Sequence, residues 1–130
     1  MIIQNAIKII EDVRNPSYIK SRNTHDYVQH TFKNGNIIAC DGGGSYIRRC
    51  GDIGNSLYEE WCLNSEDTFD TIKNKLLWGT YGKDGKGPFK YVLLKECETK
   101  HLRLILKEYP DVVDIYKKVI TSILEDRKNY

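Results

Sequence analysis

The segment between Trp78 and Phe89, WGTYGKDGKGPF, carries the residues best suited to bind a ligand. Its four glycines can turn their backbone N–H groups inward around a phosphate, and Lys83 and Lys86 add positive charge beside them. The aromatic side chains of Trp78, Tyr81 and Phe89 can stack on a purine ring. The segment therefore predicts a loop that binds the base and the phosphates of a nucleotide.

The same segment also fits a plain glycine-rich hairpin that turns at Asp84-Gly85, because Asp-Gly is a common hairpin turn. It contains neither a Walker A pattern nor the G-x-G-x-x-G fingerprint of dinucleotide-binding folds. A binding loop and a structural hairpin both stay open on the sequence alone.

Further cations could reach an anionic ligand from outside this loop. Arg103 and Lys118 lie on the helices expected after it, and Arg48 could contribute from the strand-rich half of the chain. Arg48 and Arg49 are adjacent on an expected strand, so at most one of them can face a given site, and a solvated surface pair is the plainer alternative. The predicted ligand-binding residues are Arg48, Trp78, Tyr81, Lys83, Lys86, Phe89, Thr99, Arg103 and Lys118.

Two other groups of residues have types that occur in catalysis. His25-Asp26 with Asp41 suggests a metal-dependent hydrolase, but such sites need more histidines than the three in this chain, so a structural histidine beside a turn is favoured. A cysteine nucleophile needs an activating neighbour, and no cysteine here is adjacent to a histidine; Cys97 comes nearest to an expected helix start. We therefore predict that the chain is not an enzyme and uses no metal ion or cofactor.

The composition of the 130-residue chain predicts a single small globular domain, residues 1–130. Hydrophobic residues make up 40% and charged residues 29%, and the net charge of +2 gives little attraction for polymeric nucleic acid or anionic lipid. Recognition of an anion must therefore be local. The cysteines lack C-x-x-C spacing, and the N-terminus does not read as a signal peptide. No apolar run approaches the ~20 residues of a membrane span, so we expect reduced thiols in a cytoplasmic protein.

The first half of the chain, residues 1–63, reads mainly as strands. Residues 2–13 fit one face of a helix and a strand equally well. Asn34-Gly35 is the strongest hairpin signal in the chain, with both turn positions expected at positive φ. Strands are expected at residues 25–32, 37–40, 45–49 and 57–63, and together they predict a small antiparallel meander.

The second half, residues 64–130, reads mainly as helices. Asn64-Ser65 is expected to cap a helix that ends at Gly79, and a strand is expected at residues 89–94. Thr99 is expected to cap a short helix that a proline ends. The expected fold class is α+β, with helices from the C-terminal half packed on a small antiparallel sheet from the N-terminal half.

The last helix, expected to begin after a cap at Asp111, is apolar over more of its surface than one core-facing stripe requires. Such a helix has either a partner in a second subunit or a deep position inside one domain, and both alternatives stay open. Its apolar residues are Val112, Val113, Ile115, Tyr116, Val119, Ile120, Ile123 and Leu124.

Two long stretches of the chain resemble a family of small phage proteins. The stretch THDYVQHTFKNGNIIACDGGGSYIRRCGD has the pattern H-D, a short hairpin, D-G-G and then Y-x-R-R, although Gly44-Ser45 departs from the acidic or polar residue expected before the tyrosine. The stretches LLWGTYGKDGKGPFKYVLLKECETKHLRLIL and YKKVITSILEDR are similar to the C-terminal half of the same proteins. The chain thus resembles the phage anti-Thoeris proteins over nearly its whole length.

This resemblance implies a protein that binds a cyclic ADP-ribose isomer, the signal made by a TIR-domain defence protein, and holds it without cleaving it. It also implies assembly from dimers in the cytoplasm of the infected bacterial host, and it allows a second site for cyclic oligonucleotides. Two alternatives from other classes remain. One is a small nucleotide phosphodiesterase, and the other is a protein-interaction module that inhibits a host enzyme through the apolar last helix.

Overall fold

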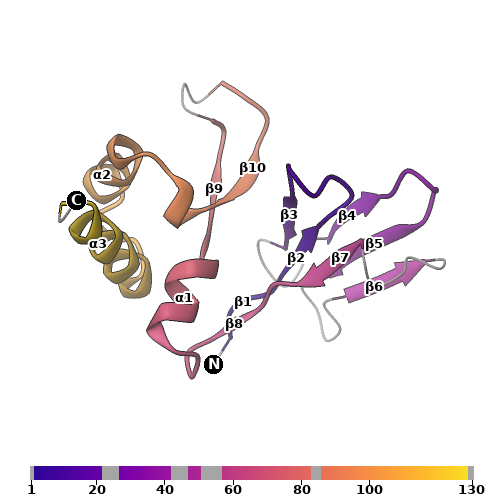
Figure 1. The fold of residues 1–130 in the computed structure, drawn as a ribbon, viewed down its shortest axis with the longest axis horizontal. Helices are drawn as coiled ribbons and strands as arrows, with labels where there is room; N and C mark the ends of the chain where they lie inside the picture. Colours follow the sequence, from indigo (N-terminus) through magenta and orange to yellow (C-terminus); the bar gives the residue numbers. More distant parts are fainter. Residues whose placement is uncertain (1, 22–26, 42–46, 51–56, 83–85, 129–130) are drawn as a thin grey trace. The chain divides into compact units, whose positions relative to one another are not determined.

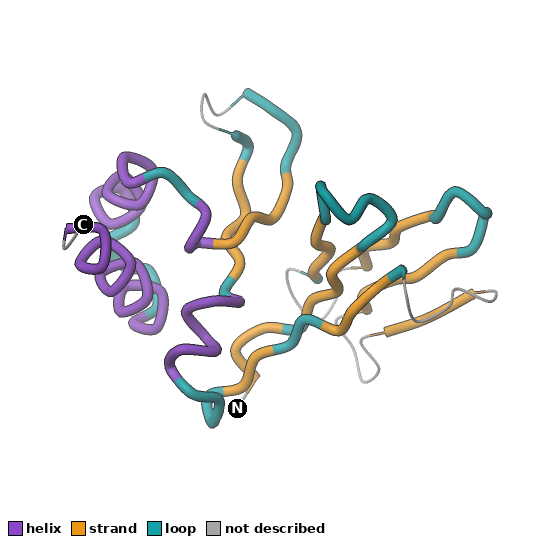
Figure 2. Tube along the Cα trace, viewed as in Figure 1, coloured by secondary structure: helices purple, strands orange, loops and turns teal. Residues whose placement is uncertain are grey.

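The computed structural model describes residues 2–21, 27–41, 47–50, 57–82 and 86–128, with only the backbone described for residues 2 and 47–50. Within these residues the chain forms small antiparallel sheets and three α-helices, which confirms the expected α+β class. The chain divides into two compact units, Met1–Ser65 and Glu66–Tyr130. Each unit is described by itself below (Figures 1 and 2).

The first unit is built from short antiparallel strands. One sheet has the order β3-β2-β7, a second has the order β4-β5-β6, and β1 pairs with β8. The strands are β1 (Ile2–Gln4), β2 (Ala6–Ile9), β3 (Ser17–Lys20), β4 (Tyr27–Thr31), β5 (Ile37–Asp41), β6 (Ile47–Cys50), β7 (Tyr58–Glu60) and β8 (Leu63–Asn64). The expected meander is therefore limited to β4, β5 and β6.

Residues 2–13, which fit a helix or a strand, form strands at their beginning. β2 pairs with β3 on one side and with β7 on the other, so its backbone groups are used by two neighbours. Ile7 and Ile9 are buried in a cluster with Ile38 and Cys40 of the second sheet and with Phe32, which follows β4. The pairing of β2 with a strand on each edge and its packing on the second sheet favour a strand over a helix. The local sequence alone does not decide between the two.

The hairpin predicted at Asn34-Gly35 joins β4 to β5, which pair from Tyr27↔Asp41 to Thr31↔Ile37. Only Gly35 has positive φ, at 88°, so the expectation of two positive-φ positions was wrong. The amide of Phe32 donates to the carbonyl of Asn36 at 2.8 Å, and the amide of Gly35 donates to the carbonyl of Phe32 at 2.9 Å. The turn is thus longer than two residues, which removes the need for a left-handed asparagine.

The second unit contains a β-hairpin, a 3₁₀ turn and the three helices (Figure 1). Its buried residues lie on all of these elements. The elements are α1 (Phe69–Lys75), β9 (Leu77–Thr80), β10 (Lys90–Leu93), η1 (Leu94–Glu96), α2 (Thr99–Glu108) and α3 (Asp114–Lys128).

Helix α1 begins and ends differently from the expectation. Its N-cap is Thr68, whose hydroxyl accepts the amide of Thr71 at 3.2 Å, and not Asn64-Ser65. The helix ends at Lys75, and Gly79 lies inside strand β9. Thr68 serves as the cap because its hydroxyl can accept a backbone amide of the first turn and it lies directly before the first helical residue.

Helices α2 and α3 confirm the expected helices with shifted starts. Glu98 is the N-cap of α2 and Thr99 is its first helical residue, so the assignment of Thr99 as the cap was wrong. Helix α3 begins at Asp114, three residues after the expected cap Asp111.

The wide apolar surface of α3 is used largely inside its own unit. The helix contacts α1, η1 and α2, and Val119, Ile120 and Ile123 are buried. The exposed positions include Lys118, Thr121 and Glu125, which are polar. A helix that packs against three elements of its own protomer needs more than one apolar stripe. The wide apolar surface of α3 therefore does not require a second subunit.

Candidate ligand-binding site

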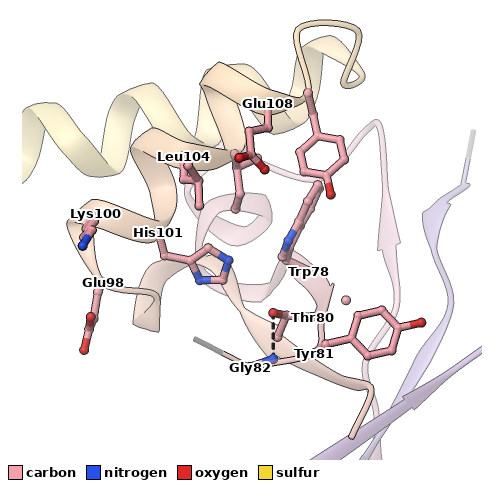
Figure 3. Close-up of a pocket in the computed structure, with 12 residues that line it drawn as sticks. Trp78, Thr80, Tyr81, Gly82, Glu98, Lys100, His101, Leu104 and Glu108 are labelled. Atoms are coloured by element: carbon pink, nitrogen blue, oxygen red, sulfur yellow. Dashed lines mark hydrogen bonds between the residues drawn. The ribbon is translucent and has the colours of Figure 1, made fainter. Parts of the chain in front are cut away.

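A hollow in the second unit lies between strand β9 and helix α2 (Figure 3), and its volume is about 570 Å³. That volume falls within the range typical of sites for small ligands. The side chains of His101 and Leu104 extend from α2 toward the strand that carries Trp78 and Thr80. The lining residues are Trp78, Gly79, Thr80, Tyr81, Gly82, Glu98, Lys100, His101, Leu104, Ile105, Glu108 and Tyr109.

The register of the hairpin determines which of its side chains face this hollow. Trp78 is opposite Val92, and Thr80 is opposite Lys90, so these side chains share one face of the two-stranded sheet. Trp78 and Thr80 line the hollow. The opposite face carries Tyr91 across from Gly79, because neighbouring residues of a strand alternate between faces.

Phe89 belongs to this opposite face of the hairpin. Its ring lies 5.2 Å from that of Tyr81 and 5.2 Å from that of Tyr91, measured between centroids. A Cβ atom added to Gly79 would lie 2.5 Å from Cζ of Phe89, so the glycine makes room for the phenyl ring. Gly79 therefore serves ring packing, and Phe89 is not among the lining residues.

Trp78 lines the hollow and is half-buried. Its ring centroid lies 5.6 Å from that of Tyr109 and 5.8 Å from that of Tyr116, both in edge-to-face arrangements. Burial, with a smaller effect of Tyr91, raises the pKa of the Tyr116 hydroxyl, as expected for a ring packed behind the tryptophan. Trp78 is thus held by the packing of the unit while it faces the hollow.

The α2 side of the hollow consists of residues that the sequence analysis did not select. Glu98, His101, Leu104 and Glu108 follow one another at intervals of three or four, which places them on one face of a helix. This periodicity was present in the sequence. It indicates a binding face only when a strand with aromatic residues is known to lie opposite that face of the helix.

A second hollow of about 380 Å³ adjoins the first. Thr80, Gly82, Glu98 and His101 line both, so the two hollows form one groove with these residues at the junction. The hydroxyl of Thr80 accepts the amide of Gly82 at 3.2 Å, which orients the chain at this point. The remaining residues of the second hollow are Lys90, Val92, Glu96 and Cys97.

Arg127, near the end of α3, holds the segment that leads into α2. Its guanidinium donates to the hydroxyl of Thr99 at 2.9 Å and to the carbonyls of Cys97 at 2.8 Å and Lys95 at 3.1 Å. Because Glu98 lies within this segment, the arginine positions the side of the groove that Glu98 and His101 line. No pattern in the sequence marks Arg127 for this role.

Two of the predicted ligand-binding residues, Trp78 and Tyr81, line the groove. The Tyr81 ring packs on Phe89 and points away from the hollow (Figure 3). Thr99 bonds to Arg127 and does not line either hollow. Lys83 lies outside the described residues, as do His25 and Asp26. Arg48 is on β6 in the other unit, and its side chain is not described. The other predicted residues, which do not line either hollow, are Lys86, Phe89, Arg103 and Lys118.

The described cysteine side chains, Cys40, Cys62 and Cys97, are free thiols. Burial raises the pKa of the Cys40 thiol to about 12 and also raises that of Cys97. Neither thiol is therefore activated as a nucleophile. Across the described ranges, no three His, Cys, Asp or Glu side chains are grouped so that they could hold a metal ion.

No helix in the described part of the chain has the length and apolarity to cross a membrane. Comparison of the chain with protein-family models, with curated proteins and with solved structures gives no match.

Proposed function

We propose that this protein binds a cyclic ADP-ribose isomer in the groove between β9 and α2 and holds it without cleaving it. The observation that carries this proposal is the hollow of about 570 Å³ lined by the aromatic residues Trp78 and Tyr109. Aromatic side chains around a cavity of this size suit a planar base. The resemblance to the phage anti-Thoeris proteins supplies the identity of the ligand.

The polar residues of the groove would complete the recognition. Lys100 and His101 can donate hydrogen bonds to phosphate oxygens, while Glu98 and Glu108 can accept hydrogen bonds from ribose hydroxyls or a base amino group. The two carboxylates outnumber the one lysine, so these residues provide no net positive charge. Binding in this groove would thus depend on placed hydrogen bonds more than on net attraction, and it would fall only modestly with added salt.

The proposed biological role is anti-defence. A phage protein of this kind, acting in the cytoplasm of the infected bacterium, removes a signalling nucleotide before its effector protein responds. Assembly from dimers is part of the same proposal and follows from the resemblance. Sequestration requires a protein concentration that matches that of the signal, because each site removes one ligand molecule.

The test is recovery of the ligand. The purified protein is exposed to the product of a TIR-domain enzyme, separated from free nucleotide and then heated, and the released material is analysed by mass. We expect an intact cyclic ADP-ribose species, with binding unchanged by EDTA. Formation of ADP-ribose that grows with protein concentration would instead identify a hydrolase. Absence of any retained nucleotide, together with capture of a host enzyme, would favour the interaction module.

A further inference from the structure

The side chain of His101 lies where the two hollows of the groove meet. Together with Thr80 and Gly82 it lines both hollows. The imidazole is half-buried and extends from α2 toward the strand that carries Thr80 (Figure 3). A ligand that fills both hollows therefore passes this ring.

The fold itself does not use the His101 imidazole. Within the described ranges, no hydrogen bond, ion pair or ring contact involves this side chain. The other described histidine, His30, bonds to Glu11 at 2.6 Å and packs edge-to-face on Phe32. A half-buried imidazole without such contacts has hydrogen-bonding capacity left over, so the ring of His101 is available to a ligand.

The hairpin supplies two further donors on the other side of the junction. The Thr80 hydroxyl accepts the Gly82 amide at 3.2 Å, and its own proton can be donated to a ligand. Lys90 is paired with Thr80 across the hairpin, so the two side chains share one face, and Lys90 lines the second hollow. Donors thus approach the junction from α2 and from the hairpin.

The carboxylates near the junction leave room for an anion. Glu98 is exposed, and its side chain extends away from Trp78 (Figure 3). Glu96 lines only the second hollow and is also exposed, so water weakens its repulsion of an anion. Lys90 and Lys100 add positive charge from the hairpin and from the start of α2. Several donors that meet at one point suit a group with several acceptor oxygens, which is the chemistry of a phosphate.

We infer that the junction of the two hollows binds a phosphate group of the ligand, with His101 as the central donor and with Thr80 and Lys90 as donors from the hairpin. The base then lies in the first hollow beside Trp78. This rests on the proposed function for the choice of a nucleotide. It goes further by naming the contacts of the phosphate and the direction in which the nucleotide lies in the groove.

AMP and adenosine, which differ by one phosphate group, are the direct probes. Both are titrated into the protein by calorimetry at the same pH and ionic strength. A hydrogen bond to a charged group is worth about a factor of ten or more. We therefore expect AMP to bind at least about 10-fold more tightly than adenosine.

Two variants test the assigned donors. His101→Phe keeps a ring and removes both ring nitrogens, and Lys90→Gln removes the charge on the opposite side of the junction. We expect each variant to bind AMP about 10-fold more weakly and to keep its affinity for adenosine. Lys107→Gln, an exposed lysine of α2 that lines neither hollow, is the matched control and should keep the full preference for AMP.

Thermal melts accompany these titrations. Neither the His101 imidazole nor the Lys90 ammonium group has a partner within the described ranges, so the melting temperature should change little. If His101→Phe fails to fold, Lys90→Gln carries the test.

Absence of AMP binding, equal affinity for AMP and adenosine, or a preference for AMP that the folded variants retain would overturn the assignment of the phosphate. Retention of the intact cyclic ADP-ribose isomer by the same protein would leave the proposed function standing. A preference for AMP that depends on His101 and Lys90, without retention of the cyclic isomer, would support the phosphate site and contradict the proposed ligand.

Discussion

At the scale of single residues, the contacts of the Glu11 carboxylate make the stability of the protein dependent on pH. It accepts the Lys33 amide at 2.8 Å and the Nε2–H of His30 at 2.6 Å. The backbone hydrogen bond from Lys33, and then that from His30, lowers the pKa of the Glu11 carboxyl below its ordinary value. These bonds tie the segment after β2 to strand β4 and to the hairpin turn.

A lowered folded-state pKa predicts a loss of stability in acid. The stabilisation is complete above the pKa of the unfolded chain and disappears as the pH falls through the lower folded value, so the change occurs below about pH 5. We expect Glu11→Gln to lower the melting temperature at neutral pH and to flatten its acid dependence. Thermal melts from pH 7 downward measure this, and Glu59→Gln, an exposed carboxylate of β7, should keep the slope of the unmodified protein. Parallel pH profiles of Glu11→Gln and the unmodified protein would contradict the assignment.

At the scale of elements, the two faces of the β9–β10 hairpin have separate tasks. Trp78 faces the groove, whereas Phe89 packs over Gly79 beside Tyr91. Both aromatic residues were predicted to stack on a base. The alternation of side chains along paired strands puts them on opposite sides of one sheet.

Substitution of each ring by alanine should separate these tasks. Phe89→Ala should cost stability, on the order of 1–3 kcal/mol because the ring is partly exposed, and should leave the affinity for ligand in the folded fraction unchanged. Trp78→Ala should reduce both stability and affinity, because the indole contacts Tyr109 and Tyr116 and also lines the hollow. Calorimetric titration beside thermal melts measures both quantities. An affinity loss in Phe89→Ala as large as that in Trp78→Ala would show that the base binds elsewhere.

The contact between α3 and the start of α2 depends on Arg127. We expect Arg127→Ala to destabilise the second unit by about 1.5–3 kcal/mol, since carbonyls and a hydroxyl lose charged donors. Arg127→Lys should recover only part of this, because one ammonium group cannot reproduce the spread of the guanidinium. Denaturant melts of both variants provide the measurement, with the exposed neighbour Lys128→Ala as the control. Full recovery by lysine would mean that charge alone matters at this contact.

At the scale of the whole molecule, assembly stays a prediction that the resemblance motivates. Ile120 and Ile123 are 0% and 4% exposed inside one protomer, so Asp at either position would unfold the second unit rather than report on an interface. Val113, just before α3, is 66% exposed and offers a cleaner probe.

We expect sedimentation to show at least a dimer at micromolar concentration. Val113→Asp should weaken the dimer about 10-fold or more while the protomer stays folded, because a charge buried in an interface without a partner is costly. A monomer at micromolar concentration would contradict the predicted assembly. A stable dimer in Val113→Asp would move the interface away from the start of α3.

The sequence by itself determined the fold class. A strand-rich half precedes a helix-rich half, and Asn34-Gly35 makes a hairpin, and both features follow from local turn chemistry and periodicity. Local rules suffice here because the residues that decide each feature are close together in the chain.

The tertiary structure alone decided which residues share a site. It selected strands for the start of the chain by giving β2 two partners, and it used the wide apolar surface of α3 within one protomer. It also placed Glu98 and His101 opposite Trp78 while it turned Phe89 away. These outcomes depend on register and on contacts between elements distant in sequence, and single-residue properties do not encode them.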